Sequence, residues 1–93
     1  MKIHIDFKGI PVLYRALNRK KEVDFEFPGK TLRELMDSLI RRYGDPIKKA
    51  ILDNNGDIDM EIRVVLNNIT YLTDDRMATP LNDGDILAFR GAS

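Results

Sequence analysis

The stretch TLRELMDSLIRRYG, residues 31–44, decides the fold because it contains one amphipathic helix together with its start and stop signals. Thr31 and Glu34 form a capping box, in which the threonine hydroxyl accepts from a free amide of the first turn and the glutamate reaches back to the cap. Gly44 suits the left-handed position after the last turn. Apolar residues recur at spacings of three and four and therefore form one stripe: Leu32, Leu35, Met36, Leu39, Ile40 and Tyr43. We expect this helix to pack across a sheet as the centre of the core.

Segments of alternating or β-branched residues flank the helix and predict the strands of that sheet. Apolar and polar residues alternate in residues 2–8 and again in 22–27, which is the period of a half-buried strand. Beyond the helix, residues 62–67 are rich in β-branched side chains, and residues 69–72 form a short segment that can pair with them. A tight turn then leads into a last strand at residues 86–89.

The order of these segments predicts an α+β fold, with a mixed sheet of about four or five strands and one main helix on one face. Ferredoxin-like and β-grasp (ubiquitin-like) folds both need consideration. A ferredoxin-like fold requires a second long crossover helix, and beyond a short helical turn at 47–51 no segment has the apolar periodicity to supply one. The β-grasp fold is therefore favoured, as a single domain over residues 1–93, because no linker or repeat divides the chain.

Composition disfavours several classes of protein. The chain contains no cysteine, so it has neither a disulfide nor a thiolate zinc site. Its 15 basic and 15 acidic residues cancel, whereas domains that track nucleic-acid phosphates usually carry a basic excess. No apolar run is long enough to span a membrane, and no signal peptide opens the chain. We therefore expect a cytoplasmic protein that binds neither nucleic acid nor membrane.

Residues able to support chemistry are too sparse to predict an enzyme. His4 is the only histidine, and by alternation it lies on the outward side of the first strand. The two serines, Ser38 and Ser93, have no base placed beside them by a recognisable motif. Asp53, Asn55 and Asp57 imitate the first ligands of a calcium loop, but Ile58 stands at the position that needs glycine and Val64 at the position of the bidentate glutamate. We predict no catalytic residue, no metal site and no cofactor, and we expect any chemistry to belong to a partner.

Three stretches of the chain, one of them the start and end of the helix, follow one another in an order and spacing typical of a known family. They are residues 31–35 (TLREL) with Tyr43-Gly44, residues 64–67 (VVLN), and residues 81–85 (LNDGD) before the last strand. Together they resemble the MoaD/ThiS family, the ubiquitin-like small subunits and sulfur carriers of molybdopterin and thiamine biosynthesis. The resemblance implies a β-grasp fold and a protein partner, which is either an adenylating E1-like enzyme or a larger synthase subunit.

The resemblance also directs attention to the C-terminal tail. In the family this tail is flexible and ends in Gly-Gly, which leaves no side chain to obstruct a narrow channel, and its carboxylate is adenylated and converted to a thiocarboxylate. Here the tail consists of Phe89, Arg90, Gly91, Ala92 and Ser93, which lack Gly-Gly and stop earlier than the family's usual terminus. This ending disfavours thiocarboxylate formation. Two hypotheses stay open: a carrier-type protein that uses its ending in an unfamiliar way, and a non-carrier interaction module.

The sheet face opposite the helix is the expected partner-binding surface. By alternation we place His4, Val65 and Leu87 on that face. The apolar residues there would form a modest hydrophobic patch, and charged residues would surround it, which is the composition expected of a partner surface. Coverage of these residues by the tail or by a loop is the alternative. Edge pairing by the last strand would also permit a homo-oligomer.

Overall fold

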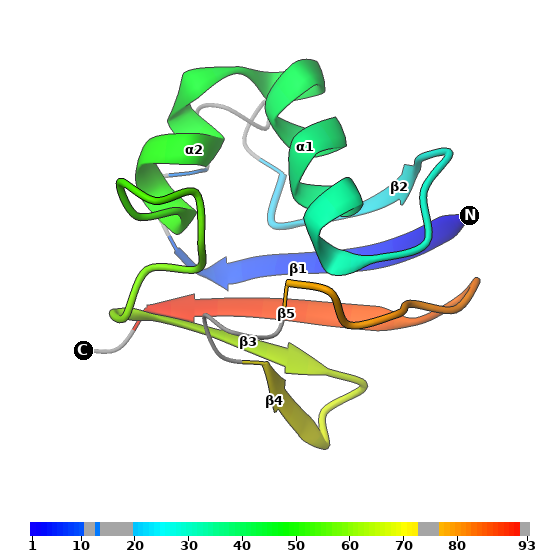
Figure 1. Cartoon of the computed structure of the whole chain (residues 1–93). Coiled ribbons are helices and arrows are strands. Elements are labelled where there is room, and N and C mark those ends of the chain that lie inside the picture. The colour runs from blue at the N-terminus through cyan, green and yellow to red at the C-terminus, as the bar shows by residue number, and fades with distance from the viewer. Residues whose placement is uncertain (11–12, 14–19, 73–76, 92–93) are drawn as a thin grey trace.

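A mixed five-stranded sheet with two helices on one side makes up the fold (Figure 1). The computed structural model describes residues 1–10, 13, 20–72 and 77–91. Its elements are β1 (Lys2–Gly9), β2 (Glu22–Glu26), α1 (Leu32–Tyr43), α2 (Asp45–Ile51), β3 (Ile62–Leu66), β4 (Thr70–Leu72) and β5 (Ile86–Gly91). The strand order is β2-β1-β5-β3-β4, in which β1 and β5 run parallel and the other neighbours antiparallel. The predicted mixed sheet and main helix are thus confirmed.

The main helix α1 begins and ends at its predicted signals. The Thr31 hydroxyl accepts from the Glu34 amide at 3.3 Å, and the Glu34 carboxylate accepts from the Lys30 amide at 3.3 Å. Gly44 follows the helix with a φ of 87°, a conformation that favours glycine. Within the described residues, neither helix is long and apolar enough to cross a membrane.

The core lies between the helices and the side of the sheet that faces them. Phe7 of β1 and Phe89 of β5 stack there with their ring centroids 5.3 Å apart. Burial of each large apolar side chain contributes about 1.5–3 kcal/mol before conformational entropy is subtracted, which is why the helix and the central strands stay together. The fully buried residues of α1 are Leu32, Leu35, Met36 and Leu39.

Asn67, in the turn between β3 and β4, fastens that turn to the start of β5. Its side-chain oxygen accepts from the Ile86 amide at 2.8 Å, and its side-chain nitrogen donates to the Asp85 carboxylate at 3.1 Å. The Asp85 carbonyl in turn accepts from the His4 amide of β1 at 3.0 Å. The first residue of β5 is therefore held between β3 and β1. This contact gives a physical reason for the joint occurrence of the VVLN and LNDGD stretches.

Leu87 does not lie on the outward face of the sheet, so that prediction is wrong. It is the register partner of Ile5 in β1, and both side chains are fully buried in the core. The run 86–89 is apolar throughout, and alternation therefore cannot tell which of its residues face outward. The structure turns Ile86 and Ala88 outward instead.

The last strand is not an edge strand either. β5 lies between β1 and β3, and its backbone is paired on both sides. Two copies of the chain therefore cannot join through β5, and this basis for a homo-oligomer is wrong. The edges of the sheet are β2 and β4 (Figure 1).

The opposite orientations of Leu87 and Ile86 predict different costs for the same truncation. Leu87→Ala leaves a cavity in the core and should lower the free energy of unfolding by about 2–5 kcal/mol. Ile86→Ala removes a side chain that is 39% exposed and should cost less than about 1 kcal/mol. Urea unfolding of the two variants measures both values, and equal costs would contradict this orientation of β5.

The Asn67 contact predicts a second contrast, with Asn68 as the matched control. Both residues have left-handed backbones, with φ of 53° and 62°, so alanine is equally strained at each. Of these two residues, only Asn67 has a side chain that forms hydrogen bonds with other described residues. Asn67→Ala should therefore destabilise the protein by about 1–2 kcal/mol more than Asn68→Ala. Thermal unfolding at equal protein concentration provides the comparison, and a difference near zero would show that the contact contributes nothing.

Candidate functional site

The open face, which is the side of the sheet turned away from α1 and α2, carries an apolar strip across three strands. Ala88, Val65 and Tyr71 are consecutive register partners on β5, β3 and β4, and Ile86 lies on the same side of β5. Ala88 and Val65 are nearly buried, at 3% and 6% exposure, whereas Tyr71 is 64% exposed and Ile86 is 39% exposed. The strip therefore presents accessible apolar groups around a packed centre.

Two arginines lie at the end of this strip. Arg63 of β3 and Arg90 of β5 are register partners, both are exposed, and neither forms an ion pair with a described residue. Like charges directly opposite one another destabilise a sheet slightly. Arg90 is followed immediately by Gly91, the last residue of β5. A positive site thus adjoins the place where the chain leaves the sheet.

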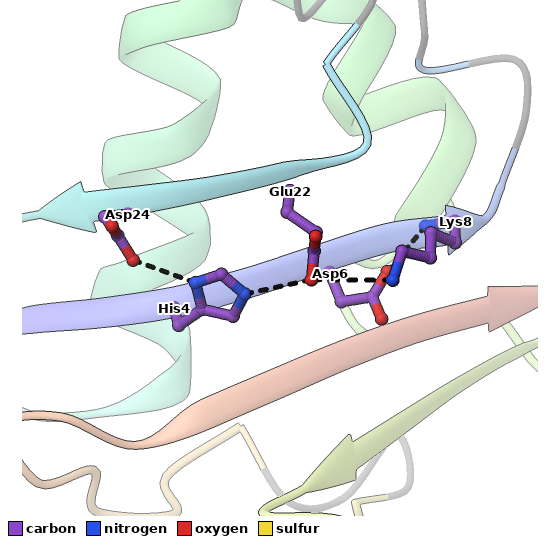
Figure 2. Close-up of polar contacts among 5 residues, drawn as sticks. All are labelled: His4, Asp6, Lys8, Glu22 and Asp24. Carbon is purple, nitrogen blue, oxygen red and sulfur yellow. Dashed lines mark hydrogen bonds and ion pairs between the residues drawn. The ribbon is translucent and has the colours of Figure 1, made fainter.

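Charged side chains of β1 and β2 cover the other half of the open face (Figure 2). The two ring nitrogens of His4 contact different carboxylates: Nδ1 lies 2.8 Å from Asp24, and Nε2 lies 3.2 Å from Glu22. The Lys8 ammonium lies 3.6 Å from the same glutamate. Hydrogen bonds to Asp24 and then to Glu22 raise the pKa of His4 above its usual value of 6.5. The same contacts with His4 lower the pKa of both carboxyl groups.

This His4 cluster is not arranged as a metal site. Its two carboxylates bind opposite nitrogens of one imidazole, so the three side chains do not converge on a common point (Figure 2). In the part of the chain that the structure describes, no group of three His, Cys, Asp or Glu side chains is placed to hold a metal ion. Asp57 of the calcium-like loop instead forms an ion pair with Arg33 of α1 at 2.9 Å.

The predicted tail begins later than the sequence suggested. Phe89 is fully buried in the core, so its assignment to an exposed tail is wrong. Arg90 and Gly91 are exposed but still belong to β5. Ala92 and Ser93 lie outside the described residues, and the prediction that this ending forms no thiocarboxylate stays a prediction.

The remaining predicted residues, His4 and Val65, lie on the open face, and their role in binding stays a prediction. Sequence reasoning missed Tyr71, Arg63 and Ile86. Each of them belongs to the site through its cross-strand neighbours. Alternation within the strand was a usable signal for Arg63, which lies two residues from Val65, but it gave none for Ile86, and which strands lie side by side was not visible in the sequence.

Comparison with known proteins gives matches in structure alone. No protein-family model matches the chain, and neither does any curated protein sequence. A chain of the Amycolatopsis orientalis BexX/CysO complex superposes with a TM-score of 0.77 at 20% identity, over 98% of this chain and 96% of that one. SAMP1 of Haloferax volcanii gives 0.75 at 15% identity, over 98% of this chain and 94% of that one. A Pyrococcus furiosus protein assigned as molybdopterin converting factor subunit 1 gives 0.67 at 20% identity, over 100% and 99% of the two chains.

These superpositions confirm the β-grasp fold that the sequence predicted. They extend over almost the whole length of each chain, so the strand order and the helix are shared together. The resemblance to the MoaD/ThiS family is thereby confirmed at the level of the fold.

The raised pKa of His4 predicts a pH dependence with a definite sign. Folded His4 holds its proton more tightly than an unperturbed histidine of pKa 6.5, so its contribution to stability is fully present below that pH and is lost as pH rises through the raised pKa. An NMR titration of the imidazole should give a midpoint above 6.5. Asp24→Asn should lower this midpoint more than Glu22→Gln, because the hydrogen bond to Asp24 is the larger cause. A wild-type midpoint at or below 6.5 would contradict the cluster.

Proposed function

We propose that this chain is a sulfur-carrier-like protein that works by docking the open face of its sheet onto a larger protein in the cytoplasm. In this proposal the chain is not itself an enzyme. The partner carries out the chemistry on the C-terminal end that the chain presents. The family resemblance implies an adenylating enzyme or a larger synthase subunit as that partner.

The observation that carries the proposal is the position of the apolar strip relative to the end of β5. Ile86 and Ala88 lie on the same strand as Gly91, which ends it. A protein bound to the strip therefore holds the departing chain at a fixed distance and direction. Such positioning replaces a search in solution by a local encounter, which is the main physical advantage of a carrier.

The charges of the same surface indicate what the partner must offer. Arg63 and Arg90 carry two positive charges at the end from which the chain departs, and no described residue neutralises them. Acidic groups on the partner would relieve their mutual repulsion and would fix the orientation of the complex. We therefore expect a partner surface with an apolar centre and carboxylates on the side that receives the chain end.

The structural neighbours support a protein partner. The same fold occurs in the BexX/CysO complex, which contains two different proteins. The Pyrococcus furiosus neighbour is assigned to a molybdopterin converting factor, which supports molybdopterin synthesis as one pathway to test.

The non-carrier interaction module shares this docking surface and differs only in the fate of the chain end. A module keeps an ordinary carboxylate, whereas a carrier exchanges one carboxylate oxygen for sulfur after adenylation. Binding experiments therefore test the docking face, and sulfur transfer separates the two hypotheses.

Substitutions on the open face should weaken binding to the adenylating enzyme of the same organism. Arg90→Glu should raise the dissociation constant at least about tenfold, because it removes a positive charge at the docking end. It also removes the repulsion from Arg63, so the variant should be as stable as the wild type. Tyr71→Ala removes the most exposed residue of the strip and should also cost about tenfold.

Lys49→Glu is the matched control, since Lys49 is exposed and its replacement makes the same charge change on α2, which lies on the other side of the sheet (Figure 1). Isothermal titration calorimetry gives the dissociation constants, and thermal unfolding checks that each variant is folded. Equal weakening by Lys49→Glu and Arg90→Glu would show that net charge, and not the open face, controls binding. Unchanged affinity in Arg90→Glu and Tyr71→Ala would contradict the proposed docking face.

A further inference from the structure

We propose that the free edge of β2 is a second binding site, which takes an extended peptide segment of alternating basic and apolar residues as an additional strand. The site lies at the opposite end of the sheet from β3 and β4 (Figure 1). The proposal does not depend on the function proposed for the open face. It rests on the backbone of β2, on a groove beside it, and on the charges along it.

The backbone of β2 has hydrogen-bonding groups directed away from the sheet. Met1 and Phe27 exchange two hydrogen bonds at 2.9 Å, and the Phe7 amide donates to the Lys21 carbonyl at 2.7 Å. Because paired residues alternate in an antiparallel ladder, the odd-numbered residues of β2 bond to β1. The amides and carbonyls of the even-numbered residues, Glu22, Asp24 and Glu26, therefore face the edge, where they pair with no described residue.

A groove of about 520 Å³ runs between this edge and the second half of α1. Its floor is aromatic, since the Phe25 ring lies 6.3 Å from that of Tyr43 and 6.4 Å from that of Phe27. Arg41 and Arg42 of α1 line the same groove and form no ion pair with a described residue. Asp24 and Glu26 also line the groove, but by alternation their side chains lie on the other side of β2, so the α1 side of the groove suits apolar side chains and its two arginines repel basic ones.

The other side of the same edge is acidic. The side chains of Glu22, Asp24 and Glu26 all point to the open face, because β2 alternates and its odd-numbered residues face α1. Glu22 and Asp24 lean toward His4 (Figure 2), and Glu26 has no ion pair among the described residues. A neighbouring strand would therefore meet carboxylates at every second residue.

These two surfaces define the occupant, because successive side chains of a strand point to opposite faces. A strand added to β2 places one alternate set of side chains over the groove and the other set beside the carboxylates. Apolar residues fit the first set and lysine or arginine the second. Slipping by one residue would bring basic residues toward Arg41 and Arg42, so the pattern also fixes the register.

A second copy of this chain does not fit the β2 edge. Antiparallel pairing of two copies of β2 would set carboxylates against identical carboxylates, and like charges directly opposite one another are destabilising. The other edge, β4, has only three residues, and residues 73–76 that follow it lie outside the described part of the chain. The charges and the groove of the β2 edge therefore favour a basic and apolar peptide.

The direct test measures binding of a short labelled peptide, Lys-Val-Lys-Phe-Lys-Val-Lys with blocked ends, by fluorescence anisotropy at fixed salt concentration. Its control has the same composition in blocks, Lys-Lys-Lys-Lys-Val-Phe-Val, and so carries the same charge without the alternation. We expect the alternating peptide to bind at least about tenfold more tightly. We also expect backbone methylation of one alternate set of its amides to abolish binding, and methylation of the other set to change it by less than about twofold. Equal binding of the two sequences, or equal effects of the two methylation patterns, would overturn the proposal.

The matching test on the protein compares Glu26→Lys with Glu61→Lys. Both glutamates are exposed and both changes alter net charge equally, but Glu61 directly precedes β3, which is three positions from β2 in the order of the sheet. Glu26→Lys should weaken the alternating peptide about tenfold, and Glu61→Lys by less than about twofold. NMR shift changes on peptide addition should centre on the amides of Glu22, Asp24 and Glu26. Equal loss in the two variants, or shift changes centred on β3 and β4, would show that the peptide does not use the β2 edge.

Discussion

The parallel pairing of β1 with β5 is the constraint on which the rest of the structure depends. It joins the first and last strands of the chain and places β5 in the middle of the sheet. The two strands can stay together at their far end because residue 9 is glycine: a Cβ there would lie 2.7 Å from the Arg90 Cα. Phe7 and Phe89, which stack in the core, are carried by these same strands. Because β5 is central, its outward residues become the middle of the open face and its end becomes the exit of the chain.

The sequence was sufficient for the parts of the fold whose signals are local. The capping box at Thr31, the apolar stripe and Gly44 define α1 without reference to the rest of the chain. The sequence could not predict which of residues 86–89 face the core, because four consecutive apolar residues fit either orientation of the strand equally well. The strand order was also out of reach, since it depends on contacts between residues such as Asn67 and Asp85, whose pairing becomes visible only in space.

For the candidate site, too, the sequence predicted features within one strand but not those formed by several strands together. His4 and Val65 were placed on the open face by alternation inside one strand. The strip from Ala88 to Tyr71 exists only through the register of three strands, which no pattern inside one strand specifies. The surface then divides into two halves with different properties. Apolar groups, and two arginines that form no ion pair with a described residue, lie over β5, β3 and β4, whereas paired charges lie over β1 and β2, where His4 contacts two carboxylates.

Sulfur transfer to a chain with a replaced tail is the measurement that tests most directly whether the domain docks onto an adenylating enzyme, whereas the same assay on the unaltered chain separates the carrier from the interaction module. The chain, with its end extended and replaced by a Gly-Gly tail, is incubated with the adenylating enzyme of the same organism, ATP and a sulfur donor. An established carrier of that enzyme serves as the positive control. The account predicts that intact-mass analysis finds one oxygen replaced by sulfur, because the domain keeps its docking face and the new tail no longer obstructs the channel. No replacement in this tail variant, under conditions in which the control carrier is converted, would contradict docking onto the adenylating enzyme, and with it the carrier-like function, and would leave the interaction module.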